Sequence, residues 1–281
     1  MKNIFLVLIP VFFSNLAYPQ NIICSLADQE AITSKIETIS DLKNDGLGET
    51  IVAVGKTFIG IPYVARTLEI GETESLVINL QGMDCTTYVE NVLAFSLMLE
   101  QQKKDFGAYT KNLETIRYKD GKLDGYASRL HYFSEWIANN EKKGLLKDIT
   151  SEIGGIESTK EIDFMSTHRE LYPFLKDQEN YKKIQESEQF LRSIPICILP
   201  QDQIQAKEHL IRTGDIIALT TSIKGLDITH TGIASREADG RIHLLHASTG
   251  SKVVELSKLP LVDYLKGIKS NTGIMVARPL Y

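Results

Sequence analysis

The apolar residues of this chain form short runs separated by turn-forming residues, and one short run leads into a much longer apolar stretch. The short run covers residues 76–80, Gly82 interrupts it, and the longer stretch extends over residues 85–99. This pattern predicts a strand, a tight turn and then a helix. Because apolar side chains surround the helix instead of forming one stripe, we expect it to be central and buried.

A cysteine stands at the start of this predicted helix. Asp84 is a favourable N-cap residue and places Cys85 in the first turn, whereas the capping-box spacing of Thr87 and Glu90 permits a later start. The unpaired N–H groups and the dipole at a helix N-terminus lower the pKa of a thiol. The charge of Asp84 opposes this effect. Taken alone, Cys85 could equally be a small buried apolar residue.

The last seventy residues alternate between short apolar runs and turn residues. Such a pattern predicts a meander of strands. The predicted strands cover residues 216–220, 228–235, 241–248, 252–256 and 273–278.

The first and middle parts of the chain predict mainly helices. We expect helices over residues 40–60 and 127–140, and over 169–193 with an interruption at Pro173. Residues 149–162 suggest one or two strands around a pair of glycines. The segment from about 103 to 209 is therefore predicted to be a large, mostly helical insertion within a single domain that spans residues 21–281.

The predicted hairpin over residues 228–248 brings two histidines together. If Ser235 pairs with Arg241, then His230 lies opposite His246, and directly opposed residues share one face of an antiparallel pair. Gly232 lies on the same face and is small, which leaves room for the end of the helix that carries the cysteine. A register slip of one residue would separate the two imidazoles.

A thiol with two imidazoles is an arrangement that supports nucleophilic catalysis. In this interpretation Cys85 is the nucleophile, His230 is the general base and then the acid, and His246 orients His230. The backbone N–H of Cys85 can bind an oxyanion. The same three side chains could instead bind Zn²⁺, but no metal-binding spacing supports that alternative, and we predict no metal and no cofactor.

Two further residues are candidates of lower specificity. His168 lies where a loop could line a cleft, although a histidine in a surface loop usually has no such role. Tyr63 follows Gly60-Ile61-Pro62 and, on its chemistry alone, is an ordinary aromatic residue.

Composition limits the possible functions. The chain has 281 residues, 43% of them hydrophobic, and a formal net charge of −5 without a long basic run. This length can bury a full core, and the acidic balance argues against nucleic-acid binding through phosphates.

The first twenty residues differ from the rest. Lys2 precedes an apolar core that is too short for a membrane span, so residues 1–20 predict a secretory signal peptide and an exported, periplasmic or secreted protein. Lipidation at Cys24 would need a small residue where Ile23 stands, which disfavours a lipoprotein. No later segment predicts a transmembrane helix. Three cysteines do not make a disulfide framework, so an unpaired Cys85 in an exported chain favours nucleophilic chemistry.

Five short motifs together resemble a known family. They are, in chain order, Gly60-Ile61-Pro62-Tyr63-Val64, Asp84-Cys85-Thr86-Thr87, Gly214-Asp215-Ile216-Ile217, His230-Thr231-Gly232-Ile233 and Leu245-His246-Ala247-Ser248. This order is similar to that of NlpC-type bacterial cell-wall cysteine peptidases, which are papain-like enzymes. Residues 83–93 most resemble the branch described as N-acetylmuramoyl-L-alanine amidase-like. The resemblance covers residues 50–100 and 210–280.

The resemblance implies an α+β, papain-like fold in which the cysteine-bearing helix packs on an antiparallel β-sheet. It implies that Cys85, His230 and His246 are the catalytic triad and that Tyr63 lies beside the cysteine and helps to bind the oxyanion. Thr86 stands where many members of the family carry serine. The implied substrates are peptidoglycan fragments, namely muropeptides.

The function expected from this resemblance is hydrolysis of the amide between N-acetylmuramic acid and L-alanine. Separately, we expect the protein to be a monomer. An alternative is a γ-D-glutamyl-diamino acid endopeptidase that cuts the stem peptide, because the same triad serves both bonds. An alternative of another class is a non-catalytic cell-wall binding module. Such a module is expected to lack a triad residue, and none is missing here.

Overall fold

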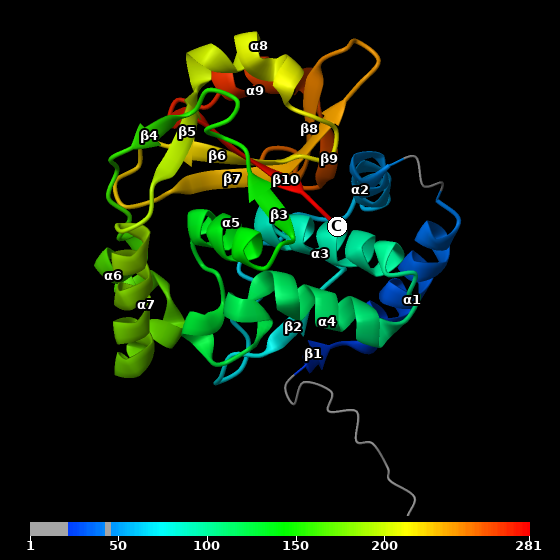
Figure 1. Ribbon diagram of the computed structural model, residues 1–281. Helices are drawn as coiled ribbons and strands as arrows, with labels where there is room; N and C mark the ends of the chain where they lie inside the picture. The colour runs from blue at the N-terminus through cyan, green and yellow to red at the C-terminus, as the bar shows by residue number, and fades with distance from the viewer. Residues whose placement is uncertain (1–21, 43–45) are drawn as a thin grey trace, which may run out of the picture.

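A computed structural model describes residues 22–42 and 46–281. The predicted signal peptide, residues 1–20, lies outside the described residues. Within them the protein has a mixed α+β architecture, as predicted (Figure 1). The helices are α1 (Leu26–Ser40), α2 (Leu47–Lys56), α3 (Cys85–Glu100), α4 (Phe106–Arg117), α5 (Phe133–Lys142), α6 (Phe164–Thr167), α7 (Gln178–Leu191), α8 (Ile204–Lys207) and α9 (Leu261–Lys266).

Most strands belong to one sheet in the order β4-β5-β10-β6-β7-β8-β9, with β3 also paired to β10, and every pairing in it is antiparallel. A separate small sheet pairs β1 with β2 in parallel. The strands are β1 (Ile22–Cys24), β2 (Leu76–Ile78), β3 (Leu146–Asp148), β4 (Ile156–Ser158), β5 (Ile196–Pro200), β6 (Ile216–Thr221), β7 (Ile228–Arg236), β8 (Ile242–Ala247), β9 (Val254–Pro260) and β10 (Asn271–Pro279).

Helices cover both faces of the large sheet (Figure 1). Ile217 and Leu219 of β6 belong to a core cluster with α9, whereas Ile216 and Ala218 belong to the cluster that contains α3. Alternate residues of one strand thus enter different cores. A strand buried on both faces is a continuous apolar run, which is why β6 was recognisable in the sequence.

Helix α3 is central and buried, as predicted. Its side chains from Val89 to Met98 are all buried, and α4 packs along it. The face on which it lies differs from the prediction, which placed the helix end over the face of Gly232. That face carries Leu244 and meets α9, whereas α3 packs on the opposite face, against Ile233. At its N-terminal end, α3 brings Cys85 beside Thr231, the residue that follows His230.

The hairpin register also differs from the prediction. Ser235 pairs with His243 instead of Arg241, a shift of two residues. The last observed pair is Arg236 with Ile242, so the loop covers residues 237–241 and lies one residue further along the chain than predicted. Since side chains alternate with a period of two, this shift leaves His230 and His246 on one face, and they become diagonal neighbours.

The segment predicted as an insertion is less separate than expected. It contributes β3, β4 and β5 to the large sheet, and α4 to the core around α3. The helix predicted over 40–60 is α2, and α7 follows the break at Pro173 as expected. Helices α1 and α4 were not predicted. No helix among the residues described by the structure is long and apolar enough to cross a membrane.

Candidate active site

The N-terminus of α3 begins with a reciprocal capping box. Asp84 accepts a hydrogen bond from the backbone N–H of Thr87 at 2.8 Å, and the Thr87 hydroxyl accepts one from the Asp84 N–H at 2.9 Å. The alternative helix start at Thr87 is therefore wrong. Cys85 is the first helical residue, where the backbone N–H has no partner within the helix.

The sulfur of Cys85 lies beside the backbone of the strand that carries His230. The backbone N–H of Thr231, the residue after His230, and the hydroxyl and N–H of Thr86 lie close enough to the sulfur to lower the thiol pKa. In the described part of the chain no direct hydrogen bond joins the thiol to the His230 ring. The three cysteines described are unpaired.

The pKa of the Cys85 thiol is raised to about 12, which is opposite to the direction expected from its place at a helix N-terminus. Burial is the main cause, and the neighbouring Asp84 carboxylate adds to it; hydrogen bonds from Thr231 and Thr86 oppose both. The thiol is therefore protonated at neutral pH and needs a base when it reacts.

His230 and His246 form a buried pair. Nε2 of His230 lies 2.6 Å from Nδ1 of His246, with the rings nearly perpendicular at 84°. Burial lowers the pKa of His230 to about 3, with a further contribution from His246, and burial lowers the pKa of His246 to about 4. Both imidazoles are neutral at neutral pH, so each can exchange a proton. Gly232 makes this packing possible, because a Cβ there would lie 2.9 Å from that of His246.

Glu255 stands directly across from His246 on β9. Its Oε1 lies 4.0 Å from Nε2 of His246, a buried nitrogen without a hydrogen-bond partner. The carboxylate acts against the effect of burial on the His246 pKa. The short motifs of the sequence contain no signal for Glu255, since its position beside His246 depends on pairing between β8 and β9.

Tyr63 lies near Cys85, as the family resemblance implied. Burial, Cys85 and Asp84 raise its pKa to about 12, so the hydroxyl keeps its proton. Hydrogen bonds on both sides hold this segment, from the Tyr63 N–H to the Lys252 carbonyl at 2.8 Å and from the Val64 N–H to the Met83 carbonyl at 3.1 Å.

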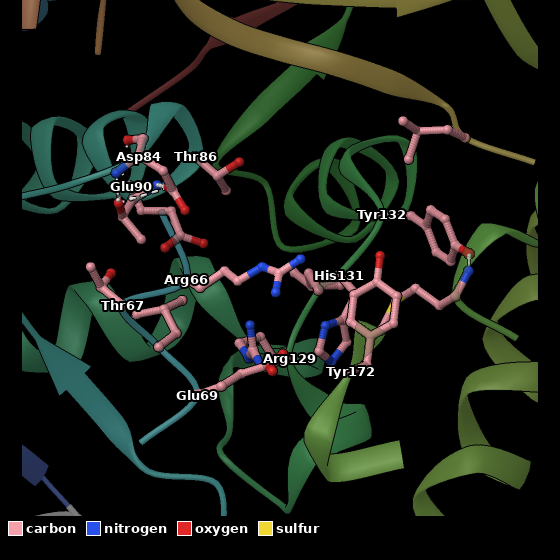
Figure 2. Close-up of a pocket in the computed structure, with 15 residues that line it drawn as sticks. Arg66, Thr67, Glu69, Asp84, Thr86, Glu90, Arg129, His131, Tyr132 and Tyr172 are labelled. Atoms are coloured by element: carbon pink, nitrogen blue, oxygen red, sulfur yellow. Dashed lines mark hydrogen bonds and ion pairs between the residues drawn. The ribbon is translucent and has the colours of Figure 1, made fainter. Parts of the chain in front are cut away.

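A pocket of about 220 Å³ opens beside the first turn of α3 (Figure 2). One wall is the start of α3, and a second is the loop that follows Tyr63. The rest comes from the segment predicted as an insertion and from Leu226, just before β7. The lining residues used below are Arg66, Glu69, Asp84, Thr86, His131 and Tyr172. His131 showed no partner pattern in the sequence, and it reaches this pocket only through the fold.

The wall from the middle of the chain is attached to the strand that carries His230. Asp227, one residue before β7, accepts hydrogen bonds from both the backbone N–H and the hydroxyl of Ser134, at 2.8 and 3.0 Å. All of these groups are buried. The pocket wall that contains Tyr132 is thus held in place relative to His230.

His168 is not one of the residues that line this pocket. Its ring stacks on Phe164 with centroids 4.1 Å apart, and its Nδ1 lies 3.0 Å from the Phe164 carbonyl oxygen. Within residues 22–42 and 46–281, no group of three His, Cys, Asp or Glu side chains is placed to hold a metal ion.

Comparison with known proteins agrees with this architecture. Residues 53–274 match the family described as N-acetylmuramoyl-L-alanine amidase-like. A comparison with curated proteins gives no match. A crystal structure described as an N-acetylmuramoyl-L-alanine amidase from Bacteroides uniformis ATCC 8492 is 41% identical, with a TM-score of 0.79, over 84% of this chain and 99% of that one.

Two other solved structures are similar. One, described as "a putative xylanase from Bacteroides fragilis", is 44% identical with a TM-score of 0.75, over 80% of this chain and 98% of that one. The other, from Legionella pneumophila str. Philadelphia 1, is 22% identical with a TM-score of 0.69, over 90% of this chain and 96% of that one, and shows a shared fold. The family match spans most of the chain, and the chain therefore belongs to the N-acetylmuramoyl-L-alanine amidase-like family.

Proposed function

We propose that this protein is a cysteine-dependent N-acetylmuramoyl-L-alanine amidase, which hydrolyses the amide between the lactyl group of N-acetylmuramic acid and L-alanine in muropeptides. The observation that carries the proposal is the position of the Cys85 sulfur at the start of α3, beside the backbone N–H of Thr231, the residue that follows His230. Nε2 of His230 is in turn hydrogen-bonded to Nδ1 of His246. We further propose a papain-like fold, an exported location and action as a monomer without a cofactor.

The proposed reaction begins with a neutral thiol. His230 takes the proton of Cys85 at Nδ1, since its Nε2 is occupied by His246, while the sulfur forms a bond to the amide carbonyl carbon. The Cys85 N–H and the Tyr63 hydroxyl donate to the oxyanion.

His230 then gives its proton to the nitrogen of L-alanine, and the carbon–nitrogen bond breaks. This step leaves a thioester between Cys85 and the lactyl group. A water molecule then attacks the thioester carbon while His230 takes its proton. The carbon–sulfur bond breaks, His230 returns that proton to the sulfur, and the sugar leaves with a free lactyl carboxyl group.

The state of the pocket carboxylates argues against glycoside hydrolysis. That reaction uses two carboxyl groups that flank the scissile bond. Asp84 caps α3. Glu69 pairs with Arg129 at 3.4 Å, and Glu90 pairs with Arg117 at 2.7 Å. Each of these carboxylates is already bound within the protein, so none is placed as a free acid or nucleophile.

The test is a digest of defined muropeptides with the wild-type protein, Cys85→Ala and Cys85→Ser, analysed by mass spectrometry. We expect only the wild type to release N-acetylmuramic acid together with an intact peptide that begins with L-alanine. A sugar that retains L-alanine and D-glutamate would show the endopeptidase instead. Full activity of Cys85→Ala would contradict cysteine dependence, and absence of product with the wild type would favour a binding module. A parallel digest with a chelator tests the zinc alternative, in which activity would be lost.

A further inference from the structure

The pocket beside α3 contains one positive charge that the protein does not neutralise. The Arg66 guanidinium extends into the pocket from the loop after Tyr63, toward His131 (Figure 2). Among the described residues it has no hydrogen-bond or ion-pair partner. Arg129, the other arginine of the pocket, pairs with Glu74 at 2.9 Å and with Glu69. An exposed arginine that faces a cavity without a partner is suited to bind an anion.

The groups around Arg66 support a carboxylate. Tyr172 extends its hydroxyl into the same pocket (Figure 2), and this group has no hydrogen-bond partner among the described residues. Burial keeps the Tyr172 hydroxyl protonated by raising its pKa to about 12, so it is a donor at neutral pH. His131 is neutral, because burial and the nearby Arg129 hold its pKa well below the usual range. The carboxylates that line the pocket are already bound within the protein, so the pocket offers one free cation and one neutral donor, which match the oxygens of a single carboxylate.

The backbone conformation of Arg66 determines which variants can test its role. Its φ is 61°, in the left-handed region that side chains other than glycine rarely adopt. Glycine would be favoured at this position on backbone conformation alone. Gln102, Asp120 and Lys252 share this region, so the conformation assigns no role by itself, but it makes Arg66→Gly a variant without backbone strain.

We propose that Arg66 binds the α-carboxylate of the D-glutamate residue of the stem peptide, with Tyr172 as a second donor. This inference rests on the proposed function, which puts L-alanine on the leaving side of the scissile amide. D-Glutamate follows L-alanine and is linked onward through its side chain, so its α-carboxylate is free. The sugar side has no free carboxylate, because its lactyl group forms the scissile amide. Arg66 comes three residues after Tyr63, and Asp84 and Thr86, which flank Cys85, line the same pocket.

The test compares two muropeptides that differ at one group, D-glutamate or D-isoglutamine, in an otherwise identical tripeptide stem. We expect kcat/KM of the wild type to be about tenfold or more higher for D-glutamate, as for a charge-assisted hydrogen bond. Arg66→Gln and Arg66→Gly should lower kcat/KM for the D-glutamate substrate to the value for the D-isoglutamine substrate, mainly by raising KM. The kcat/KM for the D-isoglutamine substrate should not change. Arg66→Gly suits the backbone conformation and therefore separates loss of the charge from misfolding.

Arg192→Gln is the matched control, because Arg192 forms only an exposed ion pair with Glu161. It should keep the preference for D-glutamate. Equal rates of the wild type on both substrates would overturn the inference and leave the proposed function intact. If Arg66→Gln lowers kcat/KM equally for both substrates, the guanidinium contacts a different part of the substrate, and the assignment to D-glutamate is overturned. If the wild type cuts neither substrate, both proposals fail together.

Discussion

Nε2 of His230 and Nδ1 of His246 are joined by a hydrogen bond of 2.6 Å between two buried, neutral imidazoles. Only one of these two nitrogens carries the proton. In the proposed reaction His230 needs a free Nδ1, so its proton lies on Nε2 and His246 accepts at Nδ1. The proton of His246 must then lie on Nε2, the atom that faces Glu255.

Removal of the His246 imidazole should therefore lower kcat strongly. We expect His246→Ala to lose about 100-fold or more, since His230 is no longer oriented and its charged form is no longer stabilised. His246→Asn, which keeps an acceptor near the position of Nδ1, should retain more activity. Steady-state kinetics on a muropeptide, with circular dichroism to check folding, measures this effect. An unchanged kcat in folded His246→Ala would exclude His246 from the mechanism.

Glu255→Gln should lower kcat about tenfold with little change in KM, because the carboxylate that faces Nε2 of His246 favours the tautomer protonated at that nitrogen. The carboxylate also raises the pKa of His246, so its loss should move the acidic limb of the kcat profile to lower pH. The pH profile distinguishes this role from a merely structural one. Glu157→Gln, on the exposed strand β4, is the control and should match the wild type. Identical pH profiles for all three proteins would remove Glu255 from the site.

The thiol of Cys85 should react slowly with iodoacetamide at neutral pH. Its pKa lies above the ordinary value, so the thiolate is scarce at pH 7, and the rate should rise steadily up to pH 10. A preformed thiolate–imidazolium pair would instead give a plateau between pH 5 and 8. The experiment uses a Cys24→Ser, Cys197→Ser background, because both of those thiols are partly exposed. Adding Cys85→Ser should abolish labelling.

The buried ion pair between Arg117 and Glu90 should be costly to break. Both side chains are 2% exposed, and the guanidinium also donates to the Val77 carbonyl at 2.6 Å. Arg117→Met leaves the Glu90 carboxylate unpaired and should lower the free energy of unfolding by about 3–5 kcal/mol. Urea denaturation measures the loss, and the double variant with Glu90→Gln should recover part of it. Equal stability of the single variant and the wild type would contradict this account.

Local patterns in the sequence were sufficient to predict the central strands and α3. Apolar runs such as residues 216–220 coincide with observed strands because both faces of the sheet are buried. Asp84 identified the helix start correctly because capping depends on neighbouring residues alone. Helix α1 was missed although Ile32, Ile36 and Ile39 have helical spacing and are buried.

Properties that depend on distant residues were not predictable in the same way. The hairpin was placed two residues out of register because its pairing depends on the turn, and the side-chain period of two still brought His230 near His246. The thiol pKa was predicted in the wrong direction because burial outweighs the helix terminus, and burial is a property of the whole fold. Glu255 and Arg66 had no local signal, since one depends on strand pairing and the other on a cavity.

The contact between Ser134 and Asp227 has a consequence for engineering the substrate range. It joins the pocket wall to β7, the strand that carries the proposed base His230. A segment from a relative that replaced residues 126–172 would therefore also shift β7, unless the new segment placed a serine where Ser134 lies. Specificity and turnover should therefore change together in chimeras that break this contact, and separately in those that keep it. A segment exchanged between members of this family should therefore include both Ser134 and Asp227. Its ends should not be chosen at the ends of the nearest helices alone.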